Sequence, residues 1–373
     1  MNKIYLDAVS TTKTDPAVLT TYKKLLDEYY CNSDALYDDG VAVYRLHEQA
    51  RANIAKLLNV KPEDIIFTSG ASEANSFAIK GTCLENMDKK HLITSIYEHS
   101  SIYNAMEQMR TKLGFDVTYL EPGEDGRINP QDVLKALRPD TALVSIMYVN
   151  NELGIINDIA TIAEIVKTKS QALFHTDITQ ALGKIDVNLE GVDMASFSSH
   201  KIHGLKGSGV LYKRSYIKLS PLISGGQQEF GIRGGTTNAA TDIVLAKTLR
   251  LALEDLPTKQ AKIQHLHDYC LNELKKIDGI KINSPEGAIS NLINISTPIK
   301  SEVMMNALNL KGIMVSSKST CGSRENEPSR VLKSMHIDDE YAIRVSFDVH
   351  NTETEIDYFI TTIKEIIQKY GWY

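Results

Sequence analysis

One cysteine stands out because its neighbours are those of a polar segment, not of a protein core. Cys321 lies in the run SSKSTCGSRENEPS (316–329), among Ser, Thr, Gly, Lys, Arg, Glu, Asn and Pro. A free thiol in such a glycine-containing segment can act as a nucleophile once it is ionised. Lys318 and Arg324 lie close enough in sequence to favour the thiolate. The place of this thiol in a polar segment therefore needs an explanation from other parts of the chain.

A lysine forms the second candidate for chemistry. Lys201 follows a strand-like run and precedes a glycine-rich turn in SFSSHKIHGLKGSGVLY (196–212). A lysine held at a protected site can form a Schiff base with a carbonyl cofactor such as pyridoxal phosphate. Ser198 and His200 beside it could hold a phosphate. The same residues also suit an ordinary surface turn, so this motif does not decide by itself.

An aspartate and a helix start could serve the same cofactor. Asp177 ends the apolar run FHTD, where a carboxylate costs free energy unless it is paired. A pyridinium nitrogen would pair with it, although it could instead cap the next turn. A further strand ends in Thr-Ser-Gly before a helix that begins near Ala71. Gly70 allows close backbone approach, and the helix N-terminus and Ser72 could bind an anion, or form an ordinary N-cap.

The elements that position these residues alternate between short β-rich runs and amphipathic helices from about residue 50 to 250. This rhythm predicts a largely parallel sheet covered by helices on both faces, with ligands beyond the carboxyl ends of the strands. After residue 255 the pattern becomes α+β. We predict a large α/β domain over 15–255. Residues 1–14 and 256–373 would form a smaller α+β domain that carries the Cys321 loop, about 316–328.

Composition excludes several classes of partner. The chain has 373 residues with 41 basic and 47 acidic side chains, a net charge of −6, and its basic residues are scattered, which argues against direct nucleic-acid binding. No apolar run approaches the roughly 18 residues of a membrane span. The first residues lack the apolar region of a signal peptide, so we expect a cytoplasmic protein with free thiols. The spacing of the four cysteines fits no metal site.

Over essentially its whole length the chain resembles cysteine desulfurases of the NifS/IscS type, which are class V, fold-type I pyridoxal-phosphate enzymes. The resemblance is carried by the segments IYLDAVSTT, FTSGASEANSFAIKG, EHSS, VNNELG, FHTDITQALGKI, SFSSHKIHGLKGSGVLY, RGGTTN, STCGSRENEPSRVL and IRVSF. It implies a homodimer whose large domain has a mostly parallel seven-stranded sheet. It also implies conversion of L-cysteine to L-alanine, with a persulfide formed on Cys321. A protein acceptor would take the sulfur for iron–sulfur cluster assembly or tRNA thiolation.

The resemblance assigns a role to each matching residue. Lys201 would form the Schiff base and later move protons, His99 would stack on the pyridine ring and assist acid–base steps, and Asp177 would pair with the ring nitrogen. Gln180 and Asn151 would hydrogen-bond near the ring hydroxyl. The phosphate would be held by Ala71, Ser72, Ser198 and His200, with Thr236 of the other subunit, and the substrate carboxylate by Arg344 and Asn32.

Alternatives remain open at this stage. His99 could be a helix N-terminal residue satisfied by backbone, and Arg344 could form a structural ion pair. The segment NSDALYDDG departs from the Asn-Pro-Ser-Ser-x-His pattern of the family, which affects Asn32. A selenocysteine lyase or another class V lyase could use the same cofactor frame. A third hypothesis is that the protein is a sulfur-relay scaffold with little turnover of its own.

Overall fold

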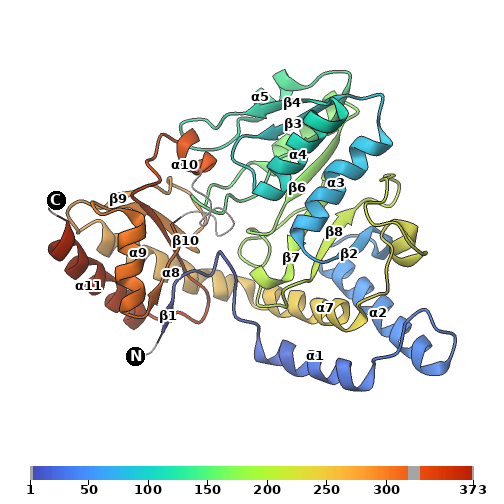
Figure 1. Cartoon of the computed structure of the whole chain (residues 1–373), viewed down its shortest axis with the longest axis horizontal. Coiled ribbons are helices and arrows are strands. Elements are labelled where there is room, and N and C mark those ends of the chain that lie inside the picture. Colours follow the sequence, from blue (N-terminus) through green and yellow to red (C-terminus); the bar gives the residue numbers. More distant parts are fainter. Residues whose placement is uncertain (1–2, 318–327, 372–373) are drawn as a thin grey trace.

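A seven-stranded, mostly parallel sheet forms the centre of the larger part of the molecule (Figure 1). The computed structural model describes residues 3–317 and 328–371, so the predicted nucleophile Cys321 lies outside the described residues. Only β8 runs antiparallel to its neighbours, β2 and β7. The strands, in spatial order, are β2 (Ile65–Thr68), β8 (Gly209–Lys213), β7 (Met194–Ser198), β6 (Leu173–Asp177), β5 (Thr141–Ser145), β3 (His91–Ser95) and β4 (Asp116–Leu120).

Helices cover both faces of this sheet, because successive strand residues point to opposite sides. Ile66 packs with α3 (Ala71–Glu85) and α4 (Ser100–Leu113) on one face. Its neighbours Ile65 and Phe67 face the other side. The helices there are α2 (Asp38–Leu57), α5 (Pro130–Ala136), α6 (Ile159–Lys169) and α7 (Ala239–Leu253). The α/β fold class is therefore confirmed.

The C-terminal part has its own antiparallel sheet and its own core. The three strands are β9 (Lys281–Ile282), β10 (Leu292–Ser296) and β12 (Ala342–Ser346), with β10 in the centre. Helices α8 (Leu256–Leu274), α9 (Ser301–Leu310) and α11 (Glu353–Tyr370) pack on it. The short helix α10 (Arg330–Ser334) instead packs against the core of the large sheet. Cys270 is buried in this core, and Cys83 is buried in the core of the large sheet.

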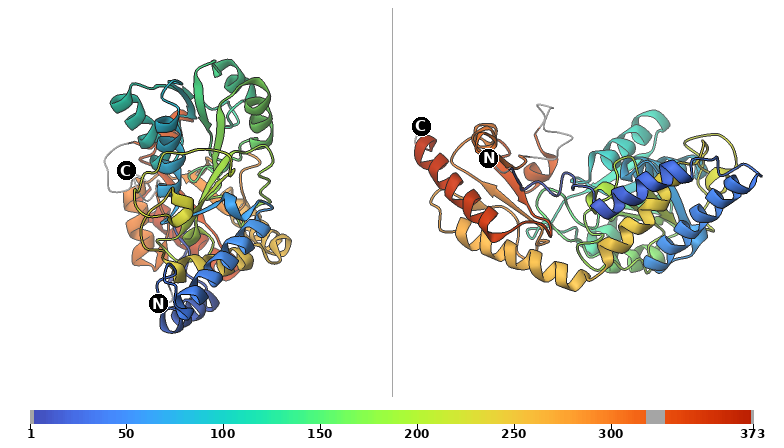
Figure 2. Two further views of the ribbon diagram at one scale, coloured as in Figure 1. Left: turned by 90° about the vertical axis from the view of Figure 1, so that its right-hand side faces the viewer. Right: turned by 90° about the horizontal axis from the view of Figure 1, so that it is seen from below.

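The N-terminus joins the C-terminal part before the chain enters the large sheet. The short strand β1 (Ile4–Tyr5) pairs in parallel with β11 (Ile313–Met314). The chain then passes to α1 (Pro16–Glu28) at the other end of the molecule (Figure 1). Helix α8 runs from the large sheet to the small one (Figure 2). The domain boundary near residue 255 stays our proposal; it falls between α7 and α8.

A buried ion pair ties α2 to the segment around Glu229. Both Nη atoms of Arg51 donate to the Glu229 carboxylate, at 2.8 and 2.7 Å, and Arg51 also donates to the carbonyl of Ile65 at 2.6 Å. Glu229 accepts a further hydrogen bond from the Phe67 amide at 2.8 Å. Glu229 has a positive φ of 47°, which costs free energy in a residue with a side chain. The ion pair therefore holds a strained backbone in place.

We expect Arg51→Met to lower the free energy of unfolding by about 3–5 kcal/mol, because it leaves the Glu229 carboxylate buried without its partner. Urea denaturation would measure the loss. The matched control is Arg250→Met, which breaks the exposed pair with Glu254 and should cost less than about 1 kcal/mol. Adding Glu229→Gln to Arg51→Met should recover part of the loss. Equal costs for Arg51→Met and Arg250→Met would contradict this account.

Candidate active site

A cavity of about 410 Å³ opens where the strands of the large sheet end, with Arg344 of β12 also in its wall. Such strand ends are where ligands bind in α/β folds. The predicted residues that line the cavity are Ala71, Ser72, His99, Asn151, Asp177, Gln180, Ser198, His200, Lys201 and Arg344. The sequence pattern therefore located most of one site, although the chemical roles of these residues stay predictions.

Two predicted residues are not in the cavity wall. Asn32 is exposed, and its side-chain oxygen accepts a hydrogen bond from the Asp34 amide at 2.9 Å, as in a local turn. Thr236 is also exposed and lies just before α7. One chain thus does not bring either residue to the cavity, and Cys321 is outside the described residues.

Asp177 stands at the carboxyl end of β6 with only 6% of its surface exposed. One carboxylate oxygen accepts a hydrogen bond from the Thr179 amide at 2.9 Å, so Asp177 does cap the turn that follows. The other oxygen accepts from the side-chain amide of Asn75 at 2.8 Å. Both of these donors are uncharged, which leaves the carboxylate able to pair with a cation in the cavity.

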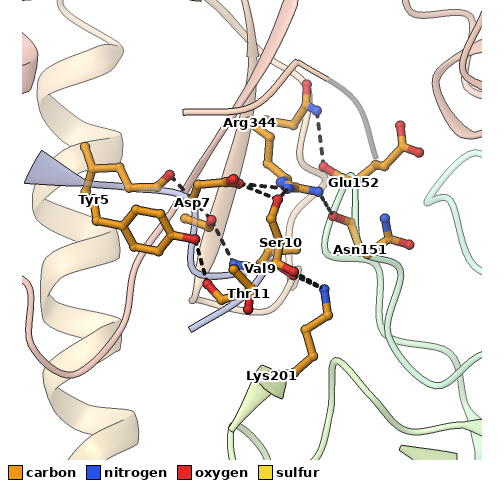
Figure 3. A network of polar contacts seen from close by, with 12 residues as sticks. Tyr5, Asp7, Val9, Ser10, Thr11, Asn151, Glu152, Lys201 and Arg344 are labelled. Carbon is orange, nitrogen blue, oxygen red and sulfur yellow. Dashed lines mark hydrogen bonds and ion pairs between the residues drawn. The ribbon is translucent and has the colours of Figure 1, made fainter. Parts of the chain in front are cut away.

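Lys201 reaches the cavity from the short turn after β7. Its ammonium donates to the carbonyls of Val9 and Ser10, at 2.6 Å each (Figure 3). These carbonyls belong to the N-terminal segment 7–12, which passes between Lys201 and Arg344 in Figure 3. The amine is therefore held at the cavity by backbone groups, in a place where it could react with a carbonyl carbon.

His99 both caps α4 and lines the cavity. Its Nδ1 accepts a hydrogen bond from the Ser101 amide at 3.1 Å and lies 2.8 Å from the Ser101 hydroxyl. Burial lowers the pKa of His99, against an opposing effect of Asp177, so the ring is neutral near pH 7. His99 therefore has both roles. Its Nδ1 caps the start of α4, and its Nε2 remains available to the cavity.

The start of α3 forms one corner of the cavity, which is the predicted anion-binding corner. Gly70, with φ of 148°, precedes the helix, and the Ala71 amide donates to the Ser198 hydroxyl at 2.7 Å. A side chain at Gly209 would place its Cβ only 2.5 Å from the Cα of Gly70, so this approach requires glycine. His200 adds a neutral imidazole, because burial, and then the charge of Lys201, lower its pKa to about 4.

Arg344 is 1% exposed and extensively hydrogen-bonded. Nη1 donates to the Asn151 carbonyl at 2.7 Å, and Nη2 donates to Asp7 at 3.0 Å and to the Ser10 hydroxyl at 2.7 Å (Figure 3). The structural ion pair left open above is therefore present. Nε is buried and has no hydrogen-bond partner among the described residues.

Sequence reasoning missed several residues of this cavity. Asp7, Val9, Ser10 and Thr11 of the N-terminal segment line it, and so does the exposed Lys206. The segment IYLDAVSTT was part of the resemblance, but no residue in it received a role. Lys206 had a signal, since it lies in the glycine-rich turn after Lys201. Asn75, which bonds to Asp177 but does not line the cavity, gave no sequence signal, because a polar residue in an amphipathic helix is ordinary.

Comparisons with known proteins agree with this fold. The model of the aminotransferase class-V family matches residues 4–359. Cysteine desulfurase IscS of Dictyoglomus turgidum is 38% identical over 376 residues, covering 98% of this chain and 95% of that protein. The solved structure of a NifS-like protein has a TM-score of 0.93 at 34% identity, covering 99% of this chain and 100% of that one. A structure of SspA in complex with cysteine has a TM-score of 0.83 at 33% identity, covering 94% and 100%.

The chain therefore belongs to the class V aminotransferase family, in its group of NifS/IscS-type cysteine desulfurases. This confirms the predicted family and the predicted type of enzyme. Within the described residues, no helix has the length and apolar character needed to cross a membrane.

Proposed function

We propose that the protein uses pyridoxal phosphate to convert L-cysteine to L-alanine and leaves the sulfur as a persulfide on Cys321. The observation that carries the proposal is the convergence of Lys201, Asp177 and His99 on one cavity. A carbonyl cofactor with a basic ring nitrogen and a phosphate needs an amine, a carboxylate and an anion-binding corner. Lys201, Asp177 and the start of α3 supply these three groups, so the residues present fit the cofactor.

Bound pyridoxal phosphate supplies an electron sink for bonds broken at the substrate carbons. Asp177 would accept a hydrogen bond from the ring nitrogen, and Gln180 would contact the ring hydroxyl. Ala71, Ser72, Ser198 and His200 would hold the phosphate. The Lys201 amine would carry the cofactor and then move the proton of the substrate α-carbon at Nζ.

Arg344 would bind the substrate carboxylate with Nε and an Nη group. The Cys321 thiolate would then attack the substrate sulfur. A sulfur–sulfur bond forms, the carbon–sulfur bond breaks, and its electron pair stays with the carbon fragment, which gains a proton and leaves as alanine. We propose that a protein acceptor takes the persulfide sulfur, for iron–sulfur cluster assembly or for tRNA thiolation.

We also propose a homodimer in which Thr236 of one subunit contacts the phosphate site of the other. Large apolar side chains are exposed around the start of α2 and the segment near Glu229, namely Tyr30 (80%), Leu36 (95%), Tyr37 (57%), Tyr44 (52%) and Phe230 (54%). A hydrogen bond of 2.6 Å from Gln228 to Asp34 joins the two segments. Exposed apolar side chains grouped in this way favour a protein partner. A cytoplasmic location, which we also propose, suits the free thiols Cys31, Cys83 and Cys270.

The test measures alanine and sulfide released from L-cysteine in the presence of a thiol reductant. Equal amounts of both products are expected, and Cys321→Ser should retain the yellow cofactor while alanine release stops. The matched control is Cys31→Ser, which removes a half-buried free thiol outside the cavity and should remain active.

Two other outcomes would redirect the proposal. If Cys321→Ser released alanine at the wild-type rate, from cysteine or from selenocysteine, the protein would be a direct lyase. If the wild type bound the cofactor but released no alanine even with an acceptor protein added, the sulfur-relay scaffold would be the better account.

A further inference from the structure

A chain of polar contacts runs behind the cavity and joins Asp177 to His99. The side-chain nitrogen of Asn75 donates to Asp177 at 2.8 Å and also to the Ser101 hydroxyl at 2.9 Å. The Ser101 hydroxyl in turn lies 2.8 Å from Nδ1 of His99. The members come from α3, β6 and the start of α4. Neither Asn75 nor Ser101 lines the cavity, so these two residues act only through others.

The direction of every hydrogen bond in this chain follows from the carboxylate. An ionised carboxylate only accepts hydrogen bonds, so Asn75 must turn its NH₂ group toward Asp177. The same NH₂ group then gives its second hydrogen to Ser101. The Ser101 hydroxyl, which now accepts from Asn75, is left to donate to Nδ1 of His99. The Ser101 backbone amide also points at Nδ1, from 3.1 Å.

The consequence concerns the proton of the neutral His99 ring. Two donors directed at Nδ1 require a lone pair there, so the proton must lie on Nε2. Nε2 is the ring nitrogen left for the cavity, since Nδ1 is turned to the start of α4. His99 therefore presents an N–H donor to the cavity. The charged groups that act on the ring are Asp177, Lys201 and Arg330.

Packing alone does not explain an asparagine at position 75. Its surface is 0% exposed, and its side-chain oxygen has no partner among the described residues. Leaving a buried acceptor unpaired lowers the stability of the fold, and an apolar side chain of similar size would avoid this loss. An apolar side chain could not supply the two hydrogen bonds that the NH₂ group of Asn75 donates to Asp177 and Ser101.

We propose that Asn75 and Ser101 are positioning residues that fix His99 in the Nε2–H tautomer and orient it together with Asp177. The role of that N–H at the cofactor rests on the proposed function, whereas the tautomer itself does not. A break at either link frees the Ser101 hydroxyl to turn away from Nδ1. The backbone amide of Ser101 is then the remaining described donor to Nδ1, so the Nε2–H form is less strongly favoured. The other tautomer, which presents an acceptor to the cavity, gains population.

Two-bond ¹H–¹⁵N correlation spectra of the full-length protein, labelled with ¹⁵N at histidine, measure the tautomer directly. The variant His99→Gln assigns the signals of His99. In the wild type, only the Nε2–H form of His99 is expected. Asn75→Leu and Ser101→Ala should each show both tautomers, while Ser101→Thr keeps the hydroxyl and should retain the wild-type form. Thr82→Ala is the matched control, because Thr82 is a buried residue of α3 whose hydroxyl bonds only within the helix.

A kinetic measurement adds a second readout. We expect kcat for alanine release to fall about tenfold in Asn75→Leu and in Ser101→Ala, the equivalent of one hydrogen bond, with KM little changed. The double variant should lose no more than the larger single loss, because both changes break one chain.

Tautomer signals that stay unchanged in Ser101→Ala would overturn the proposal. Ser101 is only half-buried, so this variant remains informative even if Asn75→Leu fails to fold. The spectra are recorded without substrate. If the tautomers behave as expected but the protein does not turn over cysteine, the proposed function is contradicted. The proposal that Asn75 and Ser101 fix the tautomer of His99 is then still supported.

Discussion

Lys201→Ala is expected to lower alanine release from L-cysteine by about 10⁴-fold or more, and to remove the yellow colour of the purified protein. The Lys201 amine is the lysine nitrogen that the structure holds beside Asp177, His99 and the anion-binding corner. The backbone carbonyls of Val9 and Ser10 each accept a hydrogen bond from it at 2.6 Å. Absorbance spectra and product release measure the two effects.

Lys201→Arg separates the amine from its charge. The guanidinium keeps a cation facing the carbonyls of Val9 and Ser10, but it stays protonated and cannot act as a nucleophilic amine. It should therefore be as inactive as Lys201→Ala while the protein remains folded. Substantial turnover in Lys201→Arg would show that the positive charge, and not the amine, is what the site requires.

Arg344→Lys is expected to reduce kcat/KM for cysteine by about 10²–10³-fold, mainly through a higher KM. A lysine keeps the charge that Asp7 needs but lacks the planar fork that binds a carboxylate with two hydrogen bonds. The unpaired Nε of Arg344 is the donor that would be lost. Steady-state kinetics over a range of cysteine concentrations would separate KM from kcat.

Asp7→Asn distinguishes the two roles of Arg344. If the arginine binds substrate, removal of the Asp7 charge leaves the carboxylate-binding groups in place, and KM should not rise. If Arg344 serves only the ion pair with Asp7, Arg344→Lys should also leave KM unchanged, and Asp7→Asn should lose more stability than Arg344→Lys, which keeps the charge. Thermal unfolding of both variants, measured alongside the kinetics, decides between these roles.

Sequence patterns predicted the parts of the site that lie at the ends of regular elements. Asp177 and Lys201 each follow an apolar strand, and parallel strands bring such residues to one edge. The strand β4 was not predicted, because its residues are mostly half-exposed and show no clear alternation. The chain from Asn75 to His99 was also out of reach, since it depends on which way one amide is turned inside the fold.

Residues that do not reach the cavity mark another limit. Asn32 and Thr236 received roles from the resemblance, and neither reaches the cavity within a single subunit. The N-terminal segment shows the opposite case. Its carbonyls contact Lys201, although backbone atoms leave no trace in residue type.

That N-terminal segment determines when the active site can exist during synthesis of the chain. Ser10 is 334 positions away in sequence from its partner Arg344, and β1 pairs with a strand that begins only at Ile313. Ser10 therefore waits for a residue that is synthesised 334 positions later. Contacts of such separation form late and slowly. The cavity wall is completed only once β12 has been made, so an incomplete chain can fold its large sheet without acquiring the assembled site that holds Lys201.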